Sequence, residues 1–126
     1  MNRLLAGRRV LVVEDEMLVL MLAEDLLEDL GCTAITAAAT VEQALDLIAL
    51  NPFDVAMVDM NLNGDRTHAV AEALAKVGVP FVFATGYAGR MREGYGDRPI
   101  LTKPYESHQL ATILASLLAP DPVAAS

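Results

Sequence analysis

Five polar residues whose side chains could act together in catalysis or binding follow short apolar runs in this sequence. They are Glu14, Asp15, Asp59, Thr85 and Lys103, and they come from four separate segments. If the apolar runs are parallel strands, their carboxyl ends meet at one edge of a sheet, which is where open α/β sheets bind ligands. We therefore expect these side chains to gather at that edge.

The chemistry of this group favours a metal and a phosphoryl group. Three crowded carboxylates repel one another, whereas Mg²⁺ prefers oxygen ligands and binds carboxylates together with phosphate. We predict that Glu14, Asp15 and Asp59 hold Mg²⁺. Lys103 suits a phosphoryl oxygen, or Asp59 when none is bound, and Thr85 offers a hydroxyl to another phosphoryl oxygen. No Cys, Ser or His is suitably placed as a nucleophile, which leaves a carboxylate that can form an acyl phosphate.

Each of these residues also has an ordinary structural interpretation. Glu14 and Asp15 could be acids at a helix N-terminus, where the helix dipole favours negative charge, and this is the role that we assign to Glu16. Thr85 could be a loop hydroxyl, and Asp59 could cap a turn. The joint placement at four strand ends is what favours a site.

Two alternating patterns predict the elements that position these residues. Runs rich in β-branched residues predict strands at Arg9–Val13, Thr33–Ala37, Val55–Val58, Val79–Ala84 and Pro99–Leu101. Helical periodicity predicts helices at Glu16–Leu30, Val41–Leu50, Thr67–Val77, Ala88–Gly94 and Glu106–Leu118. Five strand–helix repeats favour an α/β domain with a parallel sheet. The apolar runs lack clean alternation, which favours strands that are buried on both faces.

The composition bounds the class of protein. A chain of 126 residues with 54% hydrophobic residues predicts a single domain with a substantial core. No apolar run reaches the roughly 18 residues that span a bilayer, and no signal peptide is evident. We expect a cytoplasmic protein that does not bind membranes. The net charge of −8 disfavours nucleic-acid binding. The Pro- and Ala-rich tail at 120–126 is expected to fray.

Four motifs together resemble the receiver domains of two-component response regulators. They are L-V-V-E-D-E at 11–16, M-V-D-M-N-L at 57–62, F-A-T-G-Y at 83–87 and L-T-K-P-Y at 101–105, and the resemblance covers about residues 7–119. It implies one receiver domain with a flavodoxin-like doubly wound fold, in which a five-stranded parallel sheet of order 2-1-3-4-5 carries five helices. The F-A-T-G-Y motif is similar to that of FATGUY-type receivers, which are often single-domain, occur mainly in alphaproteobacteria and in some cases act in general stress signalling.

The resemblance implies a role for each site residue. Asp59 corresponds to the phosphoacceptor, and Glu14 and Asp15 correspond to the acidic pair that binds Mg²⁺. Asn61, two residues after the acceptor, corresponds to the position whose backbone carbonyl also coordinates the metal. Lys103 corresponds to the characteristic lysine of the family, and its bond to the following proline is expected to be cis.

The predicted switch departs from the family pattern. By resemblance Thr85 is the switch hydroxyl, and most receivers carry an aromatic residue three positions before the lysine that reports on it. This chain has Ile100 there. The segment 86–98 contains four glycines, so the fourth helix is expected to be short or mobile. We hypothesise that phosphorylation orders this segment, with Tyr87 or Tyr95 as the substitute reporter.

The first predicted helix begins with an entirely apolar run, Met17–Leu22. A helix that packs on one face of a sheet needs only an apolar stripe. Two interpretations stay open: burial under the last helix, or a docking surface for a histidine kinase or histidine phosphotransfer protein. Leu18 and Met21 are the candidates for docking, since Met suits an adaptable surface. A homodimer is also left open.

The predicted function is a phosphoacceptor switch rather than an enzyme. A partner phosphohistidine would donate its phosphoryl group to Asp59 with Mg²⁺ present, and the signal would leave by protein contact or onward transfer. One alternative is a Mg²⁺-dependent phosphatase or phosphotransferase with an Asp nucleophile. Such enzymes usually carry a second acid where this chain has Asn61, which disfavours this alternative. Another is a degenerate receiver that only binds partners, which the complete set of site residues disfavours.

Overall fold

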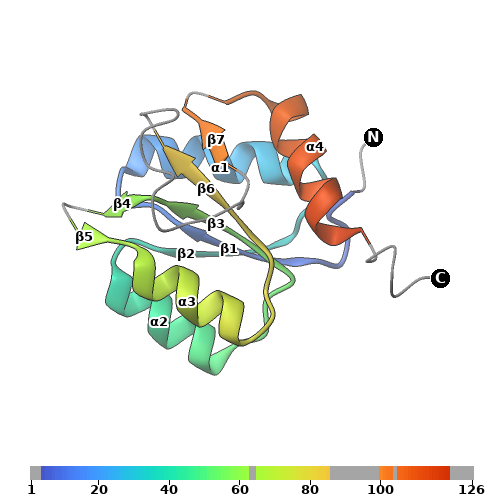
Figure 1. The fold of residues 1–126 in the computed structure, drawn as a ribbon. Coiled ribbons are helices and arrows are strands. Elements are labelled where there is room, and N and C mark those ends of the chain that lie inside the picture. Colours follow the sequence, from blue (N-terminus) through green and yellow to red (C-terminus); the bar gives the residue numbers. More distant parts are fainter. Residues whose placement is uncertain (1–3, 63–64, 86–99, 104, 120–126) are drawn as a thin grey trace.

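The computed structural model describes residues 4–62, 65–85, 100–103 and 105–119. Strands and helices alternate along the chain (Figure 1). In order they are β1 (Arg9–Val13), α1 (Met17–Asp29), β2 (Ala34–Ala38), α2 (Val41–Leu50), β3 (Val55–Asp59), β4 (Asn61–Leu62), β5 (Asp65–Arg66), α3 (His68–Lys76), β6 (Phe81–Thr85), β7 (Ile100–Thr102) and α4 (Ser107–Leu118).

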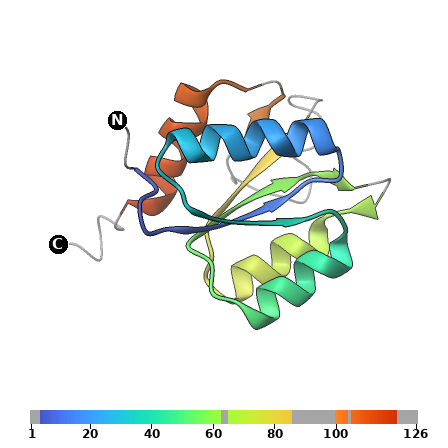
Figure 2. The same ribbon diagram turned by 180° about the vertical axis from the view of Figure 1, so that it is seen from behind.

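The main sheet has five parallel strands in the order β2-β1-β3-β6-β7. Counted along the main sheet alone, this is the predicted order 2-1-3-4-5, so the flavodoxin-like fold is confirmed. Helices α1 and α4 cover one face, and α2 and α3 cover the other (Figures 1 and 2). The described part of the chain contains four helices, and the predicted helix at 88–94 lies outside the described residues.

The core lies in two layers, one on each face of the sheet. Alternate residues of each strand point to opposite faces. On the α1 and α4 side, Val10, Val12, Met57 and Val82 pack with Ala23, Leu27, Leu110 and Leu114. On the other side, Leu11, Val13, Val58 and Phe83 pack with Ala44, Ile48, Val70 and Leu74. Burial on both faces is the reason that the strands read as continuous apolar runs.

Several predicted boundaries are wrong by one or two residues. The second strand is Ala34–Ala38 rather than Thr33–Ala37. The fourth begins at Phe81 rather than Val79, because a proline at position 80 cannot donate a hydrogen bond to the sheet. The first helix begins one residue after Glu16, which is its N-cap and makes no side-chain capping hydrogen bond.

A short antiparallel hairpin, β4–β5, was not predicted. It follows β3 directly and pairs Asn61 with Arg66 and Leu62 with Asp65. The sequence carried a signal for it, since Asn-Gly at 63–64 is a favoured two-residue hairpin connection. The two-residue strands are too short to show the alternation that identifies a hairpin, so this signal was missed.

Candidate functional site

The fold brings the predicted site residues together at the carboxyl edge of the main sheet. Glu14 follows β1, Asp59 ends β3, Thr85 ends β6 and Lys103 follows β7. Backbone hydrogen bonds continue the pairing at this edge, from the Glu14 amide to the Ala38 carbonyl (2.9 Å) and from the Lys103 amide to the Thr85 carbonyl (2.8 Å). These bonds fix the backbone from which the functional side chains project.

The amino group of Lys103 lies between two buried carboxylates. Its Nζ is 2.7 Å from Glu14 Oε1 and 3.3 Å from Asp59 Oδ2. The three side chains are between 5 and 16% exposed, so water screens these interactions weakly. The sequence predicted the contact with Asp59 but not the shorter contact with Glu14.

The acids outnumber the lysine at this edge. Glu14, Asp15 and Asp59 each offer a carboxylate oxygen, and these oxygens lie within 4.8 Å of one another. This donor set consists of hard oxygen ligands without His or Cys, which suits Mg²⁺ and does not suit the zinc sites built from nitrogen and sulfur. Three carboxylates opposite one lysine also leave an excess of negative charge for a cation to balance. The residues present therefore fit the predicted metal.

Burial and neighbouring charged groups raise the pKa values of Glu14 and Lys103. Burial, reinforced by a hydrogen bond with Asp59, raises the pKa of Glu14 to about 7 despite the opposing effect of Lys103. Burial alone would lower the pKa of Lys103, but its hydrogen bond to Glu14 and the charge of Asp59 outweigh burial and raise it. The lysine thus stays charged while Glu14 holds a proton to higher pH than an exposed glutamate would, as expected where one cation does not neutralise the acids.

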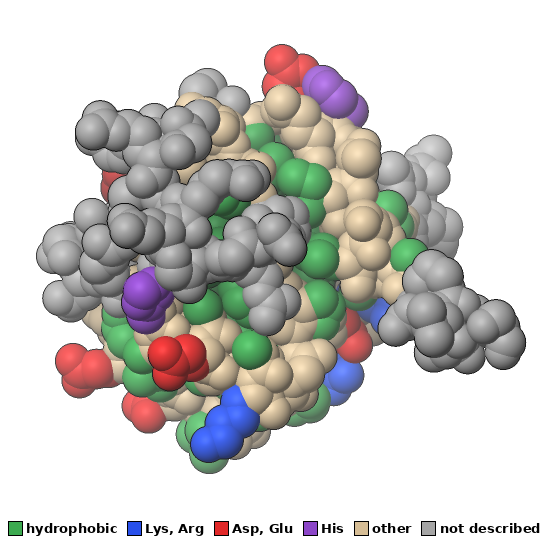
Figure 3. Space-filling model, viewed as in Figure 1, with side chains coloured by type: hydrophobic (Ala, Val, Ile, Leu, Met, Phe, Trp, Pro, Cys, Tyr) green, Lys and Arg blue, Asp and Glu red, His purple; other side chains and the backbone are tan. Residues whose placement is uncertain are grey.

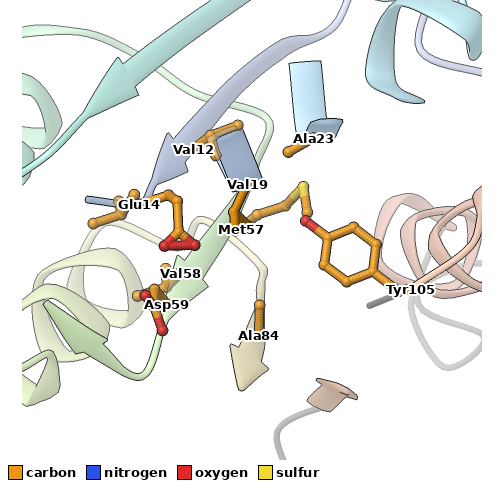
Figure 4. Close-up of a pocket in the computed structure, with 10 residues that line it drawn as sticks. Val12, Glu14, Val19, Ala23, Met57, Val58, Asp59, Ala84 and Tyr105 are labelled. Atoms are coloured by element: carbon orange, nitrogen blue, oxygen red, sulfur yellow. The ribbon is translucent and has the colours of Figure 1, made fainter. Parts of the chain in front are cut away.

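A small cavity of about 10 Å³ lies beneath the acids (Figure 4). The carboxyl groups of Glu14 and Asp59 lie near each other at one side of it, and the Tyr105 ring lies at the other side, with Met57 between them. The remaining lining is largely aliphatic, including Val19 and Ala23 of α1. Glu14 is 4% exposed against this wall, and its burial is the main cause of its raised pKa.

The structure describes the other predicted residues to different extents. Thr85 is buried, at 4% exposure. The backbone of Asn61 lies in β4, and coordination by its carbonyl stays a prediction. Ile100 is half-buried and packs on the α2 and α3 side of the sheet. Tyr87, Tyr95 and the proline after Lys103 lie outside the described residues, so the proposed reporter and the cis bond stay predictions.

Thr67 contacts the backbone of the candidate site, and the sequence did not predict this contact. Its hydroxyl donates a hydrogen bond of 2.9 Å to the backbone carbonyl of Asp59, and the residue is fully buried. In the sequence it was interpreted merely as the start of a helix. A threonine at a helix start is the ordinary N-cap residue, so nothing local distinguishes it.

Four large apolar side chains of α1 face outward and form what we call the α1 patch. They are Met17, Leu18, Met21 and Leu22, which are 66, 81, 51 and 41% exposed. The interpretation that the last helix buries the candidate docking residues is therefore wrong. The opposite side of α1 packs into the core through Ala23 and Leu27. The packing of α1 on the sheet therefore does not require the α1 patch.

The rest of the described surface agrees with the charge argument. In Figure 3, few basic side chains are visible among the coloured residues, and acidic side chains lie near them. The histidines His68 and His108 are exposed on the first turns of α3 and α4. Within the described ranges, no helix combines the length and apolar character needed to cross a membrane.

Comparison with known proteins decides the family. A family model described as the response regulator receiver domain matches residues 10–115. This chain belongs to the receiver domain family. As a receiver, it is a domain of two-component signalling, which agrees with the acidic edge and with the sheet order.

Solved structures of other receivers resemble this domain closely. The solution structure of SdrG from Sphingomonas melonis is 41% identical, with a TM-score of 0.79 over 89% of this chain and 97% of that one. A second SdrG structure, described as its BeF3-activated conformation and attributed to Pseudomonas melonis, is 42% identical over 90% of this chain and 98% of that one, with a TM-score of 0.75. The receiver domain of PhyR from Erythrobacter litoralis is 30% identical, with a TM-score of 0.79 over 92% of this chain and 96% of that one.

A curated relative is a much longer protein. The sensor histidine kinase GacS of Pseudomonas protegens is 31% identical over an alignment of 119 residues, and the match covers 84% of this chain. The receiver spans about 13% of the length of that kinase. The similarity therefore concerns a small region of GacS, and its kinase activity says nothing directly about this domain.

Proposed function

We propose that this receiver accepts a phosphoryl group on Asp59 from the phosphohistidine of a partner protein. The observation that carries this proposal is the buried edge where Lys103 contacts both Glu14 and Asp59 and where three acids converge. Mg²⁺ would be held by Glu14, Asp15 and Asp59, together with the backbone carbonyl of Asn61. Bound there, the ion would balance the charge of the acids and of the phosphoryl oxygens.

The residues of the chain account for the transfer step. A carboxylate oxygen of Asp59 attacks phosphorus, an oxygen–phosphorus bond forms, and the phosphorus–nitrogen bond of the phosphohistidine breaks as the imidazole leaves with the electron pair. Lys103 already lies 3.3 Å from Asp59 Oδ2, so its ammonium group is placed to pair with a phosphoryl oxygen. Thr85, at the end of the neighbouring strand, is the proposed hydroxyl donor to another phosphoryl oxygen.

Two observations favour a switch over an enzyme. The residue two positions after Asp59 is Asn61, whereas phosphatases with an Asp nucleophile usually need an acid there to protonate the leaving group. SdrG, a relative at about 42% identity, is described in a BeF3-activated conformation, so a close relative responds to that reagent. A receiver that only binds partners would have no need of the Lys103 contacts with two buried acids.

The α1 patch is the proposed docking surface for a histidine kinase or histidine phosphotransfer protein. Leu18 and Met21, which are 81 and 51% exposed, are the candidate docking residues, and α1 starts three residues after Glu14, beside the acidic edge. A partner seated there would bring its histidine close to Asp59. Exposed Met and Leu side chains are suited to packing against a helical bundle.

The proposal is tested by intact-mass measurement after incubation with acetyl phosphate and Mg²⁺. We expect the wild type to gain the mass of one phosphoryl group and Asp59→Asn to gain none. Asp54→Asn is the matched control, because Asp54 precedes the same strand at its other end. A mass gain that persists in Asp59→Asn, or a wild type that gains no mass under these conditions, would refute the assignment.

A further inference from the structure

Two helices on the same face of the sheet begin with a threonine, and the two threonines are used differently. Thr40 is the N-cap of α2, and its Oγ1 accepts a hydrogen bond of 3.0 Å from the Gln43 amide. Thr67 is the N-cap of α3 but makes no side-chain capping hydrogen bond. Its backbone carbonyl still accepts the first helical bond, from the Ala71 amide at 3.0 Å. The hydroxyl of Thr67 therefore contributes nothing to capping its own helix.

The hydroxyl of Thr67 instead donates to the backbone carbonyl of Asp59, eight residues earlier in the chain. Giving up a side-chain cap typically costs a helix about 1 kcal/mol. The fully buried bond of 2.9 Å to Asp59 takes its place. This hydroxyl thus ties the first turn of α3 to the residue that is the proposed phosphoacceptor.

The bond also closes a loop that contains a proposed metal ligand. Asp59 and Thr67 flank the β4–β5 hairpin, in which Asn61 pairs with Arg66. The backbone from Asp59 to Asn61 is therefore anchored in three ways: by the sheet through Asp59 and Ala84, by the hairpin, and by the Thr67 hydroxyl. The positions of the Asp59 side chain and of the Asn61 carbonyl therefore depend on how this short stretch of backbone is held.

We infer that Thr67 is a positioning residue for phosphoryl acceptance: its hydroxyl fixes the backbone of Asp59 and, through the hairpin base, that of Asn61. This inference rests on the proposed function of Asp59. Reacting groups must be held in a narrow range of positions, because small displacements cost large factors in rate. Loss of the hydroxyl removes one of the hydrogen bonds that hold the Asp59 backbone, and it leaves every acidic side chain present.

The test compares Thr67→Val, which removes the hydroxyl at nearly constant shape, with Thr67→Ser, which keeps it. The rate of phosphorylation by acetyl phosphate and the Kd for Mg²⁺ are measured for each variant well below its unfolding temperature. We expect Thr67→Val to lose about fivefold in rate and to bind Mg²⁺ more weakly, which is the equivalent of one hydrogen bond of about 1 kcal/mol. Thr67→Ser is expected to stay within about twofold of the wild type.

Thr40→Val is the matched control, since it removes a capping hydroxyl from α2 and should lower stability without changing the phosphorylation rate. If Thr67→Val does not fold, Thr67→Ala gives the same comparison with a smaller side chain. An unchanged rate in Thr67→Val, or an equal loss in Thr40→Val or Thr67→Ser, would overturn the inference while the proposed function stands. A wild type that accepts no phosphoryl group would overturn both.

Discussion

The amino and carboxyl ends of strands β1 and β3 differ in how their charged residues are paired. At the amino end, Asp54 accepts hydrogen bonds from the Arg9 amide at 2.7 Å and from Arg9 Nε at 3.3 Å, and its own amide donates to the Arg9 carbonyl. These hydrogen bonds, first from the backbone and then from the side chain of Arg9, hold the pKa of Asp54 below its usual value. At this end, the charge of one acid is balanced by the charge of one base.

At the carboxyl end of the same two strands, the charges are not balanced. Glu14 and Asp59 share one lysine, Asp15 adds a third carboxylate, and burial raises the Glu14 pKa to about 7. The amino end thus stabilises the pairing of the two strands, whereas the carboxyl end holds an excess of negative charge that a cation would balance. Functional sites commonly carry such a cost in stability.

The largest predicted difference between the two ends is in the free energy of unfolding after the basic residue is removed from each. In Mg²⁺-free protein, Lys103→Met is expected to lower the free energy of unfolding by about 3 kcal/mol, because it leaves two buried acids without their cation. Arg9→Met should cost less than about 1 kcal/mol, because the Arg9 side chain is 49% exposed and its backbone amide still bonds to Asp54. Urea unfolding measures both values, and equal losses would contradict the distinction.

The next effect is a pH dependence of opposite sign at the two ends. The raised pKa of Glu14 contributes stability below its ordinary value of 4.5, and this contribution is lost as the pH rises through about 7. The lowered pKa of Asp54 contributes stability above its ordinary value of 3.8, which is lost as the pH falls through the lowered value. Unfolding is followed by urea titration in EDTA across this range.

In those titrations we expect Glu14→Gln to flatten the decline between about 4.5 and about 7, and Asp54→Asn to flatten the loss in acid. Saturating Mg²⁺ should also remove the decline toward neutral pH, because a bound cation takes over from the proton. A decline that keeps its full slope in Glu14→Gln would show that other groups cause it.

The smallest effect is a difference of sign between the same substitution made at the two ends of β3. In Mg²⁺-free protein at about pH 8, Asp59→Asn should raise the free energy of unfolding by about 1 kcal/mol, because it relieves repulsion while Lys103 keeps Glu14. Asp54→Asn should lower it by about 1 kcal/mol through weaker hydrogen bonds to Arg9. Thermal unfolding resolves both shifts, and a loss in both variants would contradict the account.

The sequence predicted the sheet and the site residues for a physical reason. Each strand is a continuous apolar run that ends at a polar residue, so a local pattern specifies both the strand and the side chain at its end. The parallel order then places Glu14, Asp59, Thr85 and Lys103 at one edge.

Features that depend on tertiary distance could not be read from the sequence. The Thr67 bond to Asp59 and the short contact between Lys103 and Glu14 join residues 8 and 89 positions apart. In sequence Thr67 looks like any N-cap, and Lys103 has several acids as possible partners. The outward direction of the α1 patch was also undecided, because an all-apolar run does not reveal which side faces the sheet.

The central claim is that the carboxyl end of β1 and β3 is a cation site and that the amino end is structural. Its most direct test is an NMR titration of ¹⁵N-labelled protein with Mg²⁺, which follows the backbone amides at both ends. The account predicts saturable shifts at Glu14, Asp15 and Asp59, their loss in Glu14→Gln, and unchanged amides at Arg9 and Asp54. Equal shifts at both ends, or none at the carboxyl end, would contradict it.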